Sequence, residues 1–184
     1  MALSDAQALV RRGLAVFRIP TDSRVPEPGW QQQLVTTGDE TALPGMLGGD
    51  ANFGVACRAS RLVVLDLDTH HADGPARNGI ETLRTQLDIR GLTDWPRTLA
   101  VMTPGGGIHL YFRVPPDCTI ASISGGRSPL GPGIDVRGPG RRSGGYVVGP
   151  GSRIRGRPYL LAWDLPVAPL PGWIATLLTS RGPR

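Results

Sequence analysis

Apolar and polar residues alternate in three short segments of the chain, and this pattern is typical of half-buried β-strands. The first segment, 62–68, has the sequence LVVLDLD, so an apolar run ends in Asp66 and Asp68. Successive side chains of a strand point to opposite faces, which predicts that these two acids point the same way. Two acids on one buried face repel each other unless a cation lies between them, and a divalent metal ion is the obvious candidate.

The other two segments set functional residues opposite an apolar face. In 108–114, four apolar residues alternate with His109, Tyr111 and Arg113. In 134–137, two apolar residues alternate with Asp135 and Arg137. If the three segments present these residues on the same face of one sheet, three carboxylates, one histidine and two arginines converge.

The remaining patterns predict an α+β (mixed α/β) fold, with a sheet that contains hairpins and is flanked by helices. Helices are expected at 4–12 with Ser4 as N-cap, at 79–90 with Asn78 as N-cap and at 171–180, and a weak helical patch at 39–43 should end at Pro44. Further strands are expected at 14–19, 53–57, 99–102 and 146–148, with an extended segment at 152–163.

The chain length of 184 residues favours a single domain with a sizeable core. Within it we expect an N-terminal α/β portion over 1–60, the motif-bearing sheet over 61–165 and a closing helix within 166–184. The segment 53–57 is expected to lie beside 62–68 as the adjacent strand. A glycine-rich turn at 103–107 should close a hairpin between the strands on either side of it.

Composition narrows the function classes. All 20 basic residues are arginine, which excludes a P-loop lysine, a Schiff-base lysine and a lysine general base. A pI near 10.2 with a net charge of +5 is compatible with a polyanionic partner. Cys57 and Cys118 are isolated, so no zinc module is expected. No apolar stretch approaches the roughly 18 residues of a membrane-spanning helix, and a cytoplasmic location is the expectation.

The residue types suit metal-assisted chemistry on phosphates, because Mg²⁺ and Mn²⁺ prefer carboxylate oxygens. The candidate ligands of a two-metal site are Asp66, Asp68 and Asp135. The candidate phosphate-binding side chains are His109, Arg113 and Arg137. Gly106 and Gly107 lack a Cβ, so their backbone N–H groups can approach an anion closely. Each element alone also has a simpler explanation: solvated acids at a strand end, a histidine satisfied within the sheet, or a plain hairpin turn.

The order of these motifs resembles the bifunctional primase-polymerase (prim-pol) family of the archaeo-eukaryotic primase superfamily. The resemblance rests on VVLDLD at 63–68, TPGGGIHLYFR at 103–113, GIDVRG at 133–138 and GGYVVGPGS at 144–152, and it extends from GLAVF at 13–17 to YLLAW at 159–163. It implies a primase-type catalytic core with an RRM-like sheet. It also implies that Asp66, Asp68 and Asp135 hold the metals and that His109 contacts the nucleotide phosphates. Gly107 stands where the superfamily motif often has serine.

The resulting hypothesis is a template-dependent nucleotidyltransferase that uses Mg²⁺ or Mn²⁺, nucleoside triphosphates and a DNA template or primer. Arg141 and Arg142 are candidate contacts to the template phosphates. A helicase or an accessory helical domain is an expected partner in such families, encoded in a prokaryotic cell, for example on a plasmid or phage.

Two alternatives stay open at this point. One is a nucleic-acid-binding replication module without catalysis. The other is a DxD-type metal-dependent transferase: a phosphotransferase is disfavoured because Thr69 and His70 do not fit its motif and lysine is absent, and a glycosyltransferase leaves His109 and Asp135 without a role.

Overall fold

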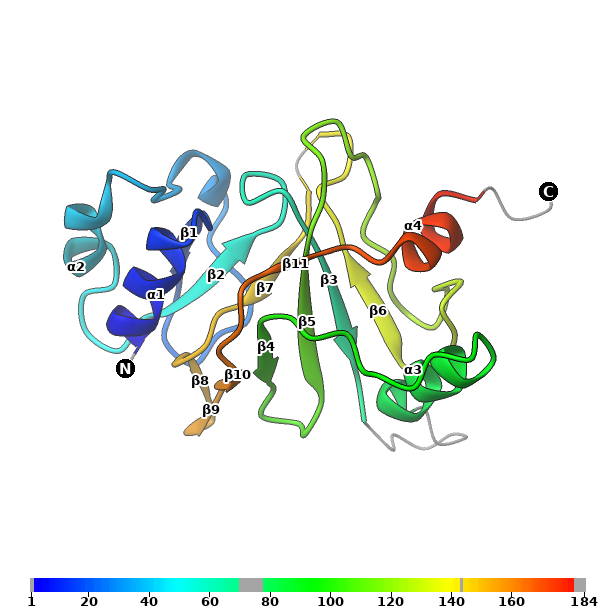
Figure 1. The fold of residues 1–184 in the computed structure, drawn as a ribbon. Coiled ribbons are helices and arrows are strands. Elements are labelled where there is room, and N and C mark those ends of the chain that lie inside the picture. Colours follow the sequence, from blue (N-terminus) through cyan, green and yellow to red (C-terminus); the bar gives the residue numbers. More distant parts are fainter. Residues whose placement is uncertain (1, 70–77, 143, 181–184) are drawn as a thin grey trace.

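The structure is a computed structural model that describes residues 2–69, 78–142 and 144–180 (Figure 1). Two antiparallel sheets form its centre. The smaller sheet has the order β1-β2-β7, with bounds Val16–Ile19, Asn52–Ala56 and Tyr146–Val148. The larger has the order β10-β4-β5-β3-β6, with bounds Leu160–Trp163, Ala100–Met102, Ile108–Arg113, Leu62–Leu67 and Ile134–Arg137, and β11 (Ala168–Pro169) pairs with β5 in parallel. A short hairpin joins β8 (Arg153–Ile154) to β9 (Arg157–Pro158).

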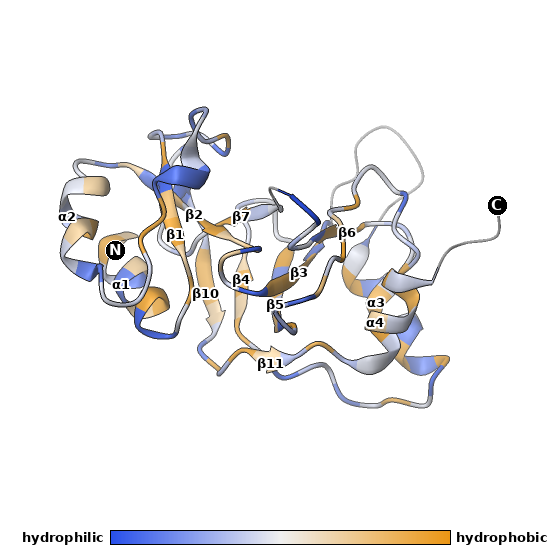
Figure 2. Ribbon diagram, turned by 90° about the horizontal axis from the view of Figure 1, so that it is seen from above, coloured by the Kyte–Doolittle hydropathy of each residue, from blue (hydrophilic) through white to orange (hydrophobic). Residues whose placement is uncertain are grey.

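Helices cover the outer sides of the sheets. The α-helices are α1 (Ala2–Arg11), α2 (Leu43–Met46), α3 (Gly79–Asp88) and α4 (Gly172–Thr179), and the short 3₁₀ turns are η1 (Trp30–Gln32) and η2 (Glu40–Ala42). Figures 1 and 2 both place α1 and α2 at the smaller sheet and α3 and α4 at the opposite end, beyond the larger sheet. The expected α+β fold class is therefore confirmed. Among the described residues, no helix is long and apolar enough to cross a membrane.

The larger sheet separates two hydrophobic cores, and strand β3 contributes to both. Val63, Leu65 and Leu67 pack in one core with residues of α3 and α4, such as Leu83 and Ile174. The alternate residues of the same strand pack in the other core, under the smaller sheet and α1. A strand buried on both faces needs apolar residues in consecutive positions, which explains the unbroken run Leu62 to Leu65.

Several predicted element boundaries agree with the structure, and the Asn78 cap is one of them. The Asn78 side chain accepts hydrogen bonds from the backbone N–H groups of Ile80 and Glu81, which stabilises the start of α3. The β4–β5 hairpin is also confirmed, with Ala100 opposite Leu110. The polar sequence of 70–78 predicts a loop, and residues 70–77 of it lie outside the described residues.

Three local predictions are wrong. Helix α1 already includes Ala2, so Ser4 is inside the helix and is not its N-cap. Gly13, with φ +78°, follows the end of the helix. Pro44 stands in the first turn of α2 instead of ending a helix, because a first-turn N–H has no helical acceptor to lose.

The third wrong prediction concerns the neighbours of β2. Strands β2 and β3 follow each other in the chain but do not pair, since β2 lies between β1 and β7 while β3 lies between β5 and β6. The smaller sheet thus takes β7 from the 61–165 portion of the chain. The chain changes sheets at a tight turn, in which the N–H of Leu62 donates to the carbonyl of Cys57 at 2.8 Å.

Candidate active site

Strand register brings three of the predicted site residues side by side. Asp66 of the central strand β3 is directly opposite His109 of β5 on one side and Asp135 of β6 on the other. Residues that face each other across antiparallel strands point to the same side of the sheet, with Cβ atoms about 4.5–5.5 Å apart. The expected convergence of the three segments on one face is therefore observed for these residues.

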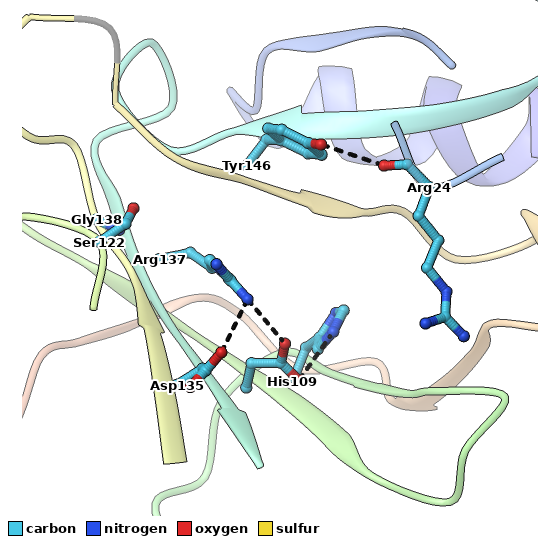
Figure 3. Close-up of polar contacts among 8 residues, drawn as sticks. Arg24, His109, Ser122, Asp135, Arg137, Gly138 and Tyr146 are labelled. Carbon is cyan, nitrogen blue, oxygen red and sulfur yellow. Dashed lines mark hydrogen bonds and ion pairs between the residues drawn. The ribbon is translucent and has the colours of Figure 1, made fainter. Parts of the chain in front are cut away.

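The polar contacts within this cluster are drawn in Figure 3. His109 Nε2 lies 3.3 Å from Asp66 Oδ1. The Arg137 guanidinium lies between the two acids, with Nη2 3.0 Å from Asp135 Oδ2 and 3.8 Å from Asp66 Oδ2. The side chains of Asp66 and Asp135 are 16% and 17% exposed, so both acids are largely desolvated and need a positive partner. Arg137 is such a partner for both acids.

The two acids experience different electrostatic environments. Burial raises the pKa of Asp66, but His109, Arg137 and Arg24 together outweigh burial and leave its pKa below the ordinary value. Burial also raises the pKa of Asp135, and the neighbouring Asp66 adds to that rise, so its net pKa is above the ordinary value despite Arg137. Asp66 is consequently the more firmly ionised carboxylate of the pair.

Asp68 follows the end of β3 and is held through its backbone. Its N–H donates to Gly133 O at 2.8 Å, and its carbonyl accepts from the N–H of Gly79 at 2.7 Å. A Cβ on Gly79 would lie 2.2 Å from Gly133 O, so this approach of α3 to the start of β6 requires glycine. The result is that Asp68 lines the same cleft as Asp66.

The cleft has a volume of about 630 Å³ and opens between the larger sheet and the β7 side of the smaller one. Its lining combines acids, cations, aromatic rings and turn residues: Arg24, Trp30, Gln31, Asp66, Asp68, Thr103, Gly105, His109, Ser122, Arg137, Gly144, Gly145, Tyr146, Val147, Val148 and Tyr159. A second hollow of equal volume, beside Arg18 and Met46, has no acidic residue in its lining. A third hollow, of about 650 Å³, has Asp94, Asp164 and Arg97 in its lining but none of the predicted site residues. The combination of Asp66, Asp68 and His109 therefore distinguishes the first cleft as the candidate active site.

One wall of the cleft contains aromatic side chains and Arg24. Trp30 stacks on Phe17 with ring centroids 4.1 Å apart, and Tyr146 contacts Trp30 edge to face at 5.4 Å. The Tyr146 hydroxyl donates to the carbonyl of Arg24 at 3.2 Å, and the Arg24 side chain extends toward the charged cluster (Figure 3). The Tyr159 ring lies 5.8 Å from that of His109. The wall thus offers a cation and flat apolar surfaces opposite the carboxylates.

The glycine-rich turn between β4 and β5 lies at the mouth of the cleft. Gly106 has φ +86°, a conformation that favours glycine. A Cβ on Gly107 would lie 2.4 Å from Leu67 O, so the turn approaches the end of β3 more closely than any other residue allows. This contact gives a physical reason for glycine where the related motif often has serine. Thr69 Oγ1 donates to Gly105 O at 3.2 Å and ties the turn to the segment after β3.

The structure does not bring every predicted residue to the cleft. Arg113 shares a face with His109 but is opposite Leu62, at the other end of β3, and its Nη1 donates to Ser60 O at 2.5 Å. Arg141 and Arg142 are exposed on the loop between β6 and β7 and do not line the cleft. They border neighbouring hollows instead.

Several polar residues of the cleft lie outside the predicted site, among them Arg24 and Tyr159. Arg24 belongs to a proline-containing loop and Tyr159 to an extended segment, so neither stands in a motif. The one indirect signal is that Tyr159 begins YLLAW at 159–163, where the family resemblance ends. Contacts between residues more than a hundred positions apart leave no local pattern in the chain.

The donor set fits a hard divalent cation. Asp66, Asp68 and Asp135 offer carboxylate oxygens in or beside one cleft, and the Arg137 guanidinium is a stand-in cation between two of them. Within the described part of the chain, no three His, Cys, Asp or Glu side chains form a ready-made metal-binding group. His109 Nδ1 is buried and without a hydrogen-bond partner among the described residues, which leaves a polar atom at the cleft to be satisfied.

An acidic cluster and arginines in one cleft define a site suited to cation-bound phosphates. A model of the family described as bifunctional DNA primase/polymerase, N-terminal, matches residues 6–173, which is most of the chain. The chain belongs to this family, and its substrates are accordingly of the DNA and nucleotide class. The match gives no support for a helicase partner. A comparison with curated proteins finds no match.

Proposed function

We propose that the protein is a template-dependent nucleotidyltransferase whose active site is the cleft at Asp66. In the reaction, the 3′-hydroxyl oxygen of a primer attacks the α-phosphate of a nucleoside triphosphate, and pyrophosphate leaves. The observation that carries the proposal is the strand register, which sets Asp66 between His109 and Asp135 on the open part of one sheet face. Membership of the primase/polymerase family supports the same reaction.

The chain's own groups have distinct roles in this proposal. Asp66, Asp68 and Asp135 would hold Mg²⁺ or Mn²⁺, which supplies charge stabilisation for the attacking and leaving oxygens. Arg137 and Arg24 bring positive charge into the cleft and neutralise phosphate oxygens. The Gly107 N–H and the His109 ring contribute hydrogen-bonding groups at the same place. The Gly106 N–H instead donates within the turn to Thr103 O at 3.0 Å, so Gly106 contributes its lack of a Cβ. The aromatic wall at Tyr146 and Trp30 offers a flat apolar surface to a bound base.

The decisive experiment is primer extension on a DNA template, with Mg²⁺ or Mn²⁺ and labelled nucleotides. Asp66→Asn and Asp135→Asn should each lower extension on the order of 10²-fold or more, the scale of losing one electrostatic partner of a transition state. The matched control is Asp88→Asn, because Asp88 is an exposed acid at the end of α3. Extension that is equal in all three variants would refute the metal-ligand assignment.

The same assay separates catalysis from binding alone. DNA binding by the wild-type protein without any primer synthesis or extension would support a replication module that lacks catalysis. Product formation that requires a template and stops in Asp66→Asn would support the enzyme.

A further inference from the structure

Two hollows continue from the active-site cleft across the surface. The first, of about 570 Å³, shares Trp30 and Gln31 with the cleft and also borders Arg58 and Arg142. The second, of about 310 Å³, shares Arg58 with the first. Adjoining hollows that share side chains form a groove, which starts at the carboxylates and passes the ring of Trp30.

The far part of this groove is strongly basic. Four exposed arginines border it, and we call them the arginine track: Arg58, Arg61, Arg141 and Arg142. The acid in the lining of these two hollows is Asp117. Within the described residues, no carboxylate forms an ion pair with any arginine of the track. Unpaired guanidinium groups along a groove suit a row of phosphates, which they bind through a planar fork.

The loop that carries Arg141 and Arg142 is anchored at its base. The N–H of Gly145 donates to Gly138 O at 2.8 Å, and the N–H of Gly140 donates to Ile120 O at 2.9 Å. A side chain at Gly138 would collide with the Ile120 carbonyl, so the base of the loop packs tightly. Arg58 Nη1 donates to Gly140 O at 3.0 Å and links the two arginine-bearing turns. These contacts hold the arginines at one edge of the groove before any ligand binds.

Arg61 adds an independent observation. Its backbone has φ +51°, a left-handed conformation in which glycine or asparagine is less strained than arginine. The turn needs only backbone hydrogen bonds, since the N–H of Arg61 donates to Arg58 O at 3.1 Å. An arginine at this position costs stability and adds a charge to the groove.

We propose that the arginine track binds the phosphate backbone of single-stranded DNA and directs that strand into the active-site cleft. This inference rests on the proposed function, because it takes the strand to be the template. A single strand fits better than a duplex, since the hollows join the cleft through shared side chains and a template must present an unpaired base there. The charge pattern carries no base-reading group, so the contact is independent of sequence.

The test is fluorescence anisotropy of labelled oligo(dT) at several salt concentrations, with EDTA and without nucleotide. The variant Arg58→Gln/Arg141→Gln/Arg142→Gln is compared with the charge-matched control Arg11→Gln/Arg84→Gln/Arg97→Gln, whose arginines are exposed and do not border the groove. We expect the track variant to bind at least about tenfold more weakly. The slope of log K against log salt should fall in magnitude by about 2, as three phosphate contacts are lost.

A second variant separates a loss of DNA contacts from a loss of folding. Arg61→Asn removes a track charge while it relaxes the backbone, so the thermal midpoint should stay or rise while the affinity for oligo(dT) falls about two- to fivefold. Equal affinities and slopes for the track variant and its control would overturn the proposal. A loss confined to duplex DNA would overturn the single-strand assignment.

The outcome is separable from that of the proposed function. Asp66→Asn should bind oligo(dT) as tightly as wild type or more tightly, because it removes negative charge from the end of the groove. Normal DNA binding with no extension by wild type would contradict the catalytic proposal alone. Normal extension on a primed template together with an unaltered track variant would contradict the arginine track alone.

Discussion

The two halves of one face of the larger sheet have opposite environments. In the first half, Leu62, Val64 and Tyr111 are fully buried under the smaller sheet and α1. In the second half, on the same strands, Asp66 and Asp135 line or adjoin an open cleft. The period-two alternation of the strands is identical in both halves.

The difference comes from where the smaller sheet ends. Its strands are only three to five residues long, so they cover the first half of the face and leave the second half open. A face that is half core and half cleft fixes charged groups on rigid strands, which is how a precise site is best supported. Substitutions in each half test this division.

The largest effect is expected when a charge enters the covered half. Leu62→Asp buries a carboxylate without a matching cation in a core where Leu62 has no exposure. We expect it to destabilise the protein by more than about 4 kcal/mol, which prevents folding in most small domains. Urea unfolding monitored by circular dichroism measures this, and Leu62→Met is the conservative control. A stable Leu62→Asp protein would contradict the view of this half as dry core.

An apolar residue placed in the open half should lower activity and leave the fold intact. Asp66→Leu removes the acid between His109 and Asp135, so primer extension should fall on the order of 10²-fold or more, equal to about 2.7 kcal/mol. The free energy of unfolding should change by no more than about 1 kcal/mol, because Arg137 still pairs with Asp135. Unfolding by this variant would show that the acid supports the fold as well as the site.

Breaking the close contact between the β4–β5 turn and β3 should destabilise the protein less than Leu62→Asp does. Gly107→Ser adds a Cβ that meets Leu67 O at 2.4 Å, so we expect a loss of about 1–3 kcal/mol and a lower extension rate. Gly172→Ala is the control, because a Cβ there meets no atom within 4 Å. Differential scanning fluorimetry reports both variants. Equal thermal unfolding midpoints for the two variants would show that the turn accommodates a Cβ at Gly107 without loss of stability.

The two acids of the open half should respond oppositely to pH in metal-free buffer. The folded pKa of Asp66 is lowered, so its ionised form stabilises the fold above its ordinary value of 3.8, and this stability is lost as pH falls through the folded pKa. The folded pKa of Asp135 is raised, so it destabilises the fold as pH rises from 3.8 through the folded pKa. The groups that face this pair are the His109 ring and the guanidinium groups of Arg137 and Arg24.

Urea unfolding between about pH 6 and pH 3 tests these signs. As pH falls, the stability of wild type relative to Asp66→Asn should decrease, whereas its stability relative to Asp135→Asn should increase. Slopes of the same sign for both comparisons would contradict the different environments assigned to the two acids.

The smallest effect is expected for Tyr111 in the covered half. Its hydroxyl is buried without a hydrogen-bond partner among the described residues, and burial raises its pKa well above the ordinary value. Tyr111→Phe removes an unsatisfied polar group, so stability should stay within about 1 kcal/mol of wild type or increase. A clear loss of stability would reveal a partner for this hydroxyl.

The sequence predicted much of this arrangement correctly, because strand faces follow local alternation. The face to which Asp66, His109 and Asp135 point follows from the alternation of side chains along each strand. The hydrogen bonds of the Asn78 cap reach only residues within three positions of it. Local patterns of this kind survive in any tertiary context that forms the same strands and helices. The wrong predictions for Ser4 and Pro44 concern helix ends, where local signals are weakest.

Other features required long-range contacts. The alternation of side chains along β5 places Arg113 on the same face as His109. Only the strand register shows that Arg113 lies at the opposite end of β3, where it donates a hydrogen bond to Ser60. Likewise, the pairing of β2 with β7 joins segments nearly a hundred residues apart, and no local pattern predicts such a partner. Arg24 and Tyr159 enter the cleft for the same reason.

The sequence alone thus determined the acids, their common face and the family, since each depends on residue identity and near spacing. Only the tertiary structure decided that half of that face is covered, that Arg137 is the cation between Asp66 and Asp135, and that a groove leads to Arg58 and Arg142. These features depend on how two sheets pack, which is a sum of many weak contacts between distant residues.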